Sequence, residues 1–244
     1  MKKHIGIFIF LIVTSLLSVW LFYKGVISTT DKSQTDSFDQ KAKEYSIELK
    51  SKLPAPGTYQ LHKIFTIPEL KVLDSTGTKQ PITKYTKGKI TLLTFFYERC
   101  SDVNGCPYAM SLFHRVKSTL DQDDELRDRI RFVHISFDPD RDTPMMMAGL
   151  EKNNANSNKN KKEIEWDFLT TSSIDALLPV VDAFGQNVDI DMSTITKNKV
   201  LSYSHVLKVF LIDEEGDVRE IYSTLYLSKD MLLNDIKTLT LDQK

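Results

Sequence analysis

Two cysteines, Cys100 and Cys106, are the residues of this chain whose type and spacing best suit chemistry. They bracket the point where an apolar run, Ile90 to Tyr97, ends and Pro107 begins a new segment. Proline suits the first turn of a helix, so Cys106 is expected at a helix N-terminus, where free amides and the helix dipole favour thiolate. The pattern predicts a reactive sulfur at Cys106, in a thiol pair able to do redox chemistry or bind a metal. A structural disulfide or two unrelated buried cysteines are the alternatives.

The composition is that of a folded globular protein, with 41% hydrophobic and 27% charged residues among 244. The formal net charge is -1 and no long basic run occurs, so we expect no nucleic acid partner. Two cysteines are too few for a disulfide scaffold or for a zinc site of four thiolates.

Residues 1–24 predict a membrane anchor. The run from Ile5 to Tyr23 carries no charge, and at about 1.5 Å per residue it reaches about 28 Å, close to the hydrocarbon thickness. A cleaved signal peptide is the alternative, but no clear small-x-small cleavage site follows the run. Lys2 and Lys3 predict a cytoplasmic N-terminus. We therefore expect a single-pass protein of the bacterial inner membrane, whose soluble domain faces the oxidising periplasm.

The rest of the chain divides into a polar tether, residues 25–53, with a possible helix over 38–53, and a domain, residues 54–244, that begins at a Pro- and Gly-rich turn. Residues 153–162 predict an exposed loop without chemistry. Strands are predicted at 64–67, 71–74, 89–97, 131–137, 166–170, 206–213 and 218–224, and helices at 107–121, 143–152, 173–184 and 228–240. Two apolar strands joined by a helix predict a parallel β-α-β unit, and residues 213–217 predict a hairpin. The fold class is therefore α/β: a thioredoxin-like fold, with a central mixed sheet flanked by helices and an N-terminal transmembrane anchor.

Several segments of the domain resemble the Sco/SenC family of copper chaperones over residues 60 to 240. They are Phe95-Phe96-Tyr97-Glu98-Arg99-Cys100 with Cys106-Pro107, Asp138-Pro139-Asp140-Arg141-Asp142-Thr143-Pro144, Trp166-Asp167-Phe168-Leu169-Thr170, Ala183-Phe184-Gly185, and His205 before a final hydrophobic strand. One feature departs from the family, whose usual spacing is three residues between the cysteines where this chain has five. The turn-prone pair Asn104-Gly105 lets the extra residues bulge outward, at an entropy cost that grows only logarithmically with loop length.

The resemblance implies a copper site formed by Cys100, Cys106 and His205. Two thiolates and one imidazole form a soft set of three ligands, which suits Cu(I) and can hold Cu(II), whereas zinc usually takes a fourth ligand. The implied role is delivery of copper to cytochrome c oxidase subunit II, or to another copper or thiol client protein. A thiol-disulfide oxidoreductase that keeps partner cysteines reduced remains the alternative, since the longer loop alters the metal geometry. A thiol peroxidase is disfavoured because no Pro-x-x-x-Thr-x-x-Cys element precedes either cysteine.

Other candidate residues have structural interpretations. Asp138 is implied by the resemblance to support the site or dock a partner, and otherwise caps a turn before Pro139. His4 lies at the leading edge of the anchor, while His62 is expected on the surface. His114 is expected to pack on its helix, and His134 to be a satisfied buried histidine. Three successive methionines, Met145 to Met147, cannot share one helix face and are expected to fill core and surface.

Overall fold

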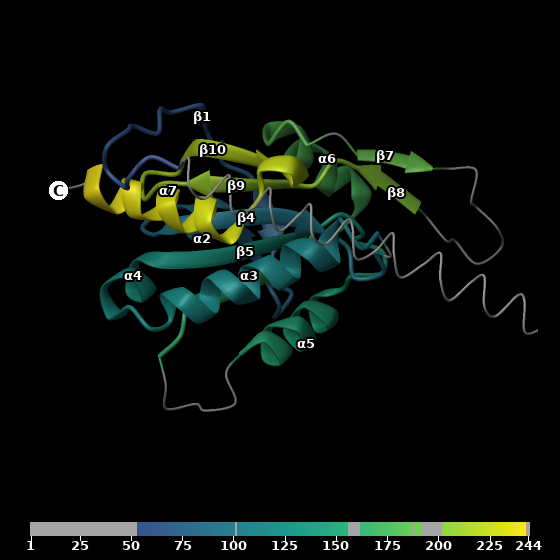
Figure 1. Cartoon of the computed structure of the whole chain (residues 1–244). Helices are drawn as coiled ribbons and strands as arrows, with labels where there is room; N and C mark the ends of the chain where they lie inside the picture. Colours follow the sequence, from purple (N-terminus) through teal and green to yellow (C-terminus); the bar gives the residue numbers. More distant parts are fainter. Residues whose placement is uncertain (1–52, 101, 156–161, 187, 192–201, 243–244) are drawn as a thin grey trace, which may run out of the picture. The chain divides into compact units, whose positions relative to one another are not determined.

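A six-stranded mixed sheet forms the centre of the domain, which spans Pro54–Lys244 in the computed structural model. The structure describes residues 53–100, 102–155, 162–186, 188–191 and 202–242. The strand order is β1-β10-β9-β4-β5-β6 (Figure 1). Three strands run parallel: β4 (Ile90–Phe96), β5 (Ile130–Ser136) and β6 (Glu165–Leu169). The others pair antiparallel: β1 (Phe65–Thr66), β9 (Lys208–Ile212) and β10 (Asp217–Ser223).

Strand β4 lies in the middle of the sheet because its sequence suits burial on both faces. All seven of its residues are buried. Leu92 and Phe96 belong to the core cluster on one face, while Leu93 and Phe95 belong to the cluster on the other. A continuous apolar run is typical of a strand with helices on both sides, and this strand carries the first cysteine at its C-terminal end.

Helices cover both faces of the sheet. The first core cluster contains residues of α3 (Cys106–Leu120), α5 (Pro144–Asn154) and α7 (Lys229–Asp242). The second cluster contains residues of α2 (Thr83–Thr86) and α6 (Ile174–Ala183). The remaining elements are a hairpin of β2 (Lys71–Leu73) and β3 (Lys79–Pro81), a hairpin of β7 (Val188–Asp191) and β8 (Ser202–His205), α4 (Asp124–Arg129) and η2 (Thr224–Tyr226). The predicted α/β class, a thioredoxin-like mixed sheet with flanking helices, is confirmed.

The hairpin predicted over residues 213–217 joins β9 to β10. Asp213 organises this turn, since its carboxylate accepts the amides of Glu215 and Asp217 at 3.1 and 2.8 Å. Gly216 has φ +87°, a left-handed conformation that residues with a Cβ rarely adopt. The turn therefore depends on a carboxylate at position 213 and on glycine at position 216.

Every predicted strand and helix between residues 64 and 240 is present, with ends shifted by a few residues. The prediction missed six short elements of the described residues: α2, α4, β3, β7, β8 and η2. Helix α4 reads Asp-Glu-Leu-Arg-Asp-Arg, which has no apolar face, and it begins because the Asp123 carboxylate accepts the amide of Leu126 at 3.1 Å. The predicted anchor and the predicted helix at 38–53 lie outside the described residues. Among the described residues, no helix is both long and apolar enough to cross a membrane.

Candidate metal and thiol site

Cys100 and Cys106 lie beside each other where β4 ends and α3 begins. Both are free thiols; Cys100 is half-buried, and Cys106 is 8% exposed. Cys100 lies close enough to Cys106 to raise the pKa of its thiol. The six-position separation therefore brings the two thiols together, as the sequence predicts for a redox pair or a metal site.

The five-residue loop between the cysteines turns outward at Asp102. The Asp102 carboxylate accepts the amide of Asn104 at 3.0 Å, and its carbonyl oxygen accepts the amide of Gly105 at 2.9 Å. Val103, at the tip, is 74% exposed. Gly105 then caps α3, and its carbonyl oxygen accepts the amide of Ala109. The extra residues thus extend into solvent, and the strand and helix ends still bring the sulfurs together.

The predicted thiolate character of Cys106 is wrong. Cys106 is the first residue of α3, as expected, but its side chain belongs to the core cluster beneath the helix. Burial raises the pKa of the Cys106 thiol, and the nearby Cys100 raises it further. The backbone at Tyr97 and Cys106 lowers the pKa but does not reverse this shift. Cys106 is therefore a protonated, buried thiol, and Cys100 is the more accessible sulfur.

Tyr97 lies beside the cysteines. Its ring is half-buried and packs against both core clusters at the end of β4. Its carbonyl oxygen accepts the amide of Cys100 at 3.1 Å. Burial, followed by the nearby Cys100, raises the pKa of the Tyr97 phenol to about 12, so the hydroxyl keeps its proton. Sequence reasoning included Tyr97 in the strand but assigned it no role.

The segment Asp138 to Pro144 supports the chain just before Cys100. The Asp142 carboxylate accepts the amide of Glu98 at 3.0 Å and the hydroxyl of Ser136 at 2.6 Å. Burial raises the pKa of Asp142. Asp138 is 1% exposed and forms an ion pair with Arg141. Sequence reasoning named Asp142 only within the segment that resembles the family and gave it no role of its own, because an aspartate just before a helix is usually a structural residue.

His205, the third predicted ligand, is the last residue of β8, where its backbone pairs with Val188 of β7. Its side chain lies outside what the structure describes. In the described part of the chain, no group of three or more His, Cys, Asp and Glu side chains is arranged to hold a metal. The structure therefore brings Cys100 and Cys106 together, and the ligand role of His205 stays a prediction.

The remaining candidates largely follow expectation. His62 is exposed, and His114 lies on α3 with its ring against Trp166. His134 is buried, as predicted, and burial lowers its pKa to about 3. Its Nδ1 accepts from the indole of Trp166 at 3.0 Å, but its Nε2 has no hydrogen-bond partner, so it is only half satisfied. Met147 is buried while Met145 is 83% exposed, which confirms that successive methionines face different ways. His4 lies outside the described residues.

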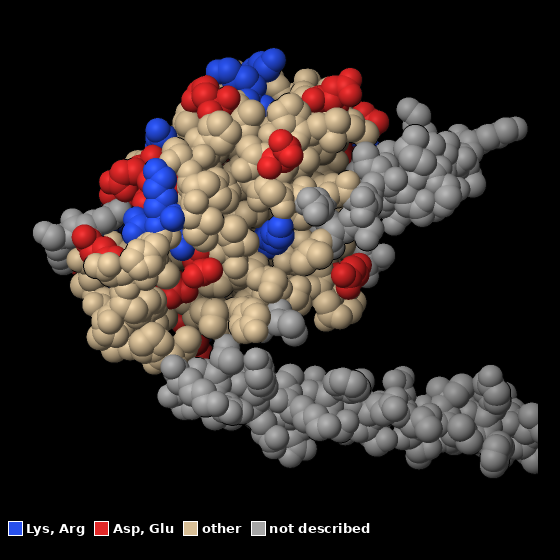
Figure 2. Space-filling model, turned by 90° about the horizontal axis from the view of Figure 1, so that it is seen from above, with Lys and Arg blue, Asp and Glu red and all other residues tan. Residues whose placement is uncertain are grey.

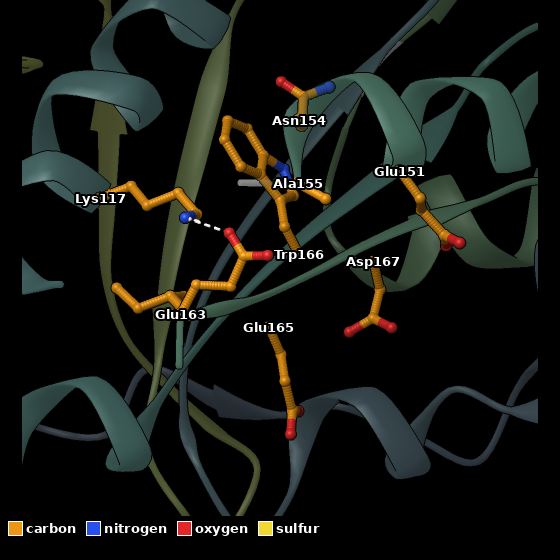
Figure 3. A pocket seen from close by; sticks show the side chains of 9 residues that line it. Lys117, Glu151, Asn154, Ala155, Glu163, Glu165, Trp166 and Asp167 are labelled. Atoms are coloured by element: carbon orange, nitrogen blue, oxygen red, sulfur yellow. Dashed lines mark hydrogen bonds and ion pairs between the residues drawn. The ribbon is translucent and has the colours of Figure 1, made fainter. Parts of the chain in front are cut away.

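A pocket of about 300 Å³ lies apart from the cysteines, between α3, α5 and β6 (Figure 3). Its lining includes several carboxylates, and Lys117 enters from α3 to pair with Glu163 at 2.6 Å. Lys117 is eleven positions after Cys106, or about 16 Å along the helix. The pocket does not include either thiol.

Charged side chains of both signs are scattered over the face seen in Figure 2. Ion pairs also join different elements of the fold: Arg129 of α4 meets Glu214 at 2.9 Å, and Lys63 meets Asp217 at 3.0 Å. The surface charges in these places are thus partly neutralised, in keeping with the formal net charge of -1.

Solved structures of other proteins share this fold, and three of them are informative. They are ScoI of Arabidopsis thaliana with copper bound (TM-score 0.57, 19% identity, 72% of this chain and 98% of that one), ScoI of Bradyrhizobium japonicum with copper bound (0.55, 21%, 71% and 99%), and BsSco (0.55, 19%, 73% and 96%). BsSco is described as having a disulfide switch and as a member of the Sco family of cytochrome c oxidase assembly proteins. At these identities the likeness establishes the fold.

The sequence itself establishes the family. No curated protein sequence matches the chain. The model of the SCO1/SenC family, however, matches residues 67–241, which include β4, both cysteines, the segment that supports them and His205. This match covers well over half of the chain, and it agrees with the fold and with the placement of the thiols. The chain belongs to the SCO1/SenC family.

Proposed function

We propose that this protein is a copper chaperone that binds copper through Cys100, Cys106 and His205 and supplies it for assembly of the copper site of cytochrome c oxidase. The observation that carries the proposal is the proximity of two free thiols at the junction of β4 and α3. Membership of the SCO1/SenC family and the copper-bound ScoI structures support it.

The two sulfurs suit copper as a cargo. Thiolates are soft ligands that favour Cu(I), and one half-buried and one buried sulfur leave the site open to a partner on the side of Cys100. A metal must displace the proton that burial keeps on Cys106, so copper uptake releases protons and weakens at low pH. His205 supplies the third ligand, with Cys100 as the accessible position from which copper passes to the client.

The client we propose is subunit II of cytochrome c oxidase or another protein with a copper or thiol site. BsSco, which shares the fold, is described as a cytochrome c oxidase assembly protein. We further propose that residues 1–24 anchor the chain in the bacterial inner membrane and that the domain faces the periplasm, since Lys2 and Lys3 precede an uncharged run of spanning length.

A thiol-disulfide oxidoreductase is the second candidate, and a more accessible free thiol beside a buried one favours it. In that role the accessible Cys100 attacks a partner disulfide to form a mixed disulfide. Cys106 then displaces the partner, which leaves with its cysteine reduced while Cys100 and Cys106 become a disulfide. The disulfide switch described for BsSco supports this alternative.

Copper titration of the reduced full chain, purified in detergent, tests the proposal. We expect about one copper per chain in the wild type, and loss of most binding in Cys100→Ser and Cys106→Ser. His205→Ala removes a ligand, so its affinity should fall by at least about tenfold, while His62→Ala, at an exposed histidine, should bind like the wild type. Full affinity in either cysteine variant would show that the thiol pair does not hold the metal.

The same variants separate the two functions. A chaperone needs His205, so His205→Ala should lose both copper and support of oxidase assembly while its rate of exchange with a disulfide substrate stays unchanged. An oxidoreductase needs only the sulfurs. If oxidase assembly survives His205→Ala but fails in either cysteine variant, the oxidoreductase is the better explanation.

A further inference from the structure

We propose that Gln186 is a positioning residue of the copper site, whose buried side-chain amide holds the backbone beside His205 and so gives the site its affinity for Cu(II). This inference rests on the proposed function and deepens it, because it names the residue that decides how well each oxidation state of the cargo is held. It starts from the hydrogen bonds at the base of the β7–β8 hairpin.

The hairpin that carries His205 depends on its attachment to the domain. Among the described residues, β7 and β8 pair only with each other, through four residue pairs that begin with Val188 and His205. An isolated two-stranded hairpin is marginally stable in water. The position of His205 is therefore set by the residues at the base of the hairpin, which are Gln186 before β7 and Val206 after β8.

Gln186 ties these two ends of the hairpin together. Its side-chain Nε2 donates to the carbonyl oxygen of Val206, the residue after His205, at 3.0 Å. The Val206 side chain is 61% exposed, so packing of that side chain does not hold the residue in place. Lys208 adds a second bond across the base, since its Nζ donates to the carbonyl oxygen of Gly185 at 2.6 Å.

Gln186 is itself held at the end of α6. It is 3% exposed, and its backbone amide donates to the carbonyl oxygen of Val181 at 2.9 Å. Gly185, just before it, has φ +56° and donates to the carbonyl oxygen of Asp182 at 2.9 Å, so the chain makes a defined turn as it leaves the helix. The Gln186 side chain therefore acts from a fixed helix end, and its loss would leave the Val206 carbonyl without this donor.

The segment that Gln186 holds leads directly to the strand of the thiols. Strand β9 begins at Lys208 and runs antiparallel to β4, with Val209 opposite Thr94. The Thr94 hydroxyl also donates to the carbonyl oxygen of Lys208 at 2.8 Å. The start of β9 and the end of β4 thus share one edge of the sheet, and Cys100 follows β4 at that edge. Gln186 consequently fixes the backbone between the proposed imidazole ligand and the thiols.

The two oxidation states of copper need the imidazole to different degrees. Thiolates are soft ligands, and two of them suffice for Cu(I), whereas Cu(II) favours nitrogen and oxygen ligands in a tetragonal arrangement. Displacement of His205 therefore costs the site more affinity for Cu(II) than for Cu(I). By holding the backbone beside His205, Gln186 stabilises bound Cu(II) and lowers the reduction potential of the bound metal.

Gln186→Leu tests this role, because leucine keeps a side chain of similar bulk but lacks the amide donor. The reduced full chain, purified in detergent, is titrated with Cu(I) in the absence of oxygen and separately with Cu(II), each against a competing chelator. We expect the dissociation constant for Cu(II) to rise about tenfold, as is typical for residues that orient a metal ligand, and that for Cu(I) to change by less than about twofold. A tenfold change in their ratio corresponds to a potential about 59 mV more positive for a one-electron couple.

Two comparisons show whether the effect passes through His205. In the His205→Ala background, Gln186→Leu should cause no further loss of Cu(II) affinity, because a residue that only positions another has no effect once that other is removed. Gln80→Leu is the matched control. It also removes a side-chain amide that donates, to the Asp74 carboxylate at 3.1 Å, but it lies in β3 and should leave both constants unchanged. Thermal unfolding confirms that the variants are folded.

Hydrogen exchange in the copper-free chain measures the backbone directly. The backbone amides of residues 202–208 should exchange faster in Gln186→Leu than in the wild type, because the base of the hairpin loses a hydrogen bond that joins it to the end of α6. In Gln80→Leu they should exchange at the rate of the wild type. This measurement does not depend on copper binding.

Unchanged constants in Gln186→Leu overturn the proposal, and so does an equal loss of affinity for Cu(I) and Cu(II), which would show general damage to the site. If His205→Ala weakens Cu(II) binding but Gln186→Leu does not, only the role of Gln186 fails. If the wild type binds no copper, the chaperone function fails, and the exchange rates alone decide whether Gln186 holds the backbone beside His205.

Discussion

At the scale of single residues, Cys106 shows which of two opposing effects controls a thiol. A helix N-terminus stabilises a negative charge by about 0.3–1 kcal/mol, and up to about 2 kcal/mol in partly buried sites. Removing a charge from water costs several kcal/mol. Cys106 is 8% exposed and packs in the core, so the cost of burial is larger than the gain from the dipole. The position of Cys106 at the start of the helix was predictable from the sequence, but the burial of its side chain depends on tertiary packing.

Asp142 gives a prediction about the support of the site. Asp142→Ala leaves the buried Ser136 hydroxyl and the Glu98 amide without their acceptor, so the free energy of unfolding should fall by about 1–3 kcal/mol. The backbone before Cys100 should also loosen, and copper affinity should fall. Chemical denaturation and copper titration measure the two effects.

Asp140→Ala is the control for this prediction, because Asp140 lies in the same segment and is exposed. Its free energy of unfolding should stay within about 0.5 kcal/mol of the wild type. Equal stability of Asp142→Ala and Asp140→Ala would show that Asp142 does not support the loop.

The sequence identified the site residues whose type alone indicates chemistry, and it missed those whose role depends on their neighbours in the fold. Cys100 and Cys106 were found because a thiol pair at the junction of a strand and a helix is rare. Tyr97 and Asp142 were missed as partners of the site, because a tyrosine in an apolar strand and an aspartate before a helix have ordinary structural roles. Their positions beside the thiols and Glu98 arise only when β4, β5 and α3 pack together.

At the scale of helices and strands, long segments with a clear apolar pattern were predicted correctly, whereas short segments were missed. Strands β4 and β5 are seven residues long and mostly apolar, so their pairing as a parallel unit followed from the sequence. Strand β7 has only four residues and alternates Val and Ile with Asp, and it pairs with the equally short β8. A four-residue pattern is too short to distinguish a strand from a loop, which is why this hairpin was missed beside the predicted ligand His205.

Helix α7 is joined to the start of the domain by a buried polar network. The Asp235 carboxylate accepts hydroxyls from Tyr222 of β10, at 2.7 Å, and from Tyr59. Asn234 donates to the carbonyl oxygen of Pro54 at 3.0 Å and to the Tyr59 hydroxyl at 2.7 Å. Burial raises the pKa of Asp235, so this carboxylate depends on its two tyrosine donors.

Tyr222→Phe should therefore lower the free energy of unfolding by about 1–3 kcal/mol, because a buried carboxylate oxygen loses its donor. In Tyr226→Phe the lost hydroxyl is on a side chain that is 55% exposed, so stability should change by no more than about 0.5 kcal/mol. Thermal unfolding distinguishes them, since 1 kcal/mol corresponds to a shift of about 2–4 °C in a domain of this size. Identical melting temperatures for the two variants would contradict a stabilising role of the network.

At the scale of the whole molecule, the domain begins along α7, away from the thiols. Gly57 donates to Thr238, and Thr238 lies near the C-terminal end of the helix. The thiol site lies near the N-terminal end of α7. There the hydroxyl of Tyr108, two residues after Cys106 in α3, donates to the carbonyl oxygen of Leu227, just before α7 begins. Residues 25–53, which the sequence predicts to be a polar tether, therefore join the domain at the end of α7 that lies farther from Cys100 and Cys106.

The proposed anchor gives the last prediction. If residues 1–24 span the membrane and stay attached, the full chain should remain in the membrane fraction after a carbonate wash, while a chain that begins at Gly25 should be released. Protease added to intact spheroplasts should digest the domain if Lys2 and Lys3 direct the N-terminus to the cytoplasm, as the positive-inside rule predicts. Mass spectrometry of the membrane-bound protein should then find the N-terminal residues. A mature chain that lacks them would establish a cleaved signal peptide, and a domain protected from protease would reverse the orientation and place the thiols in a reducing compartment.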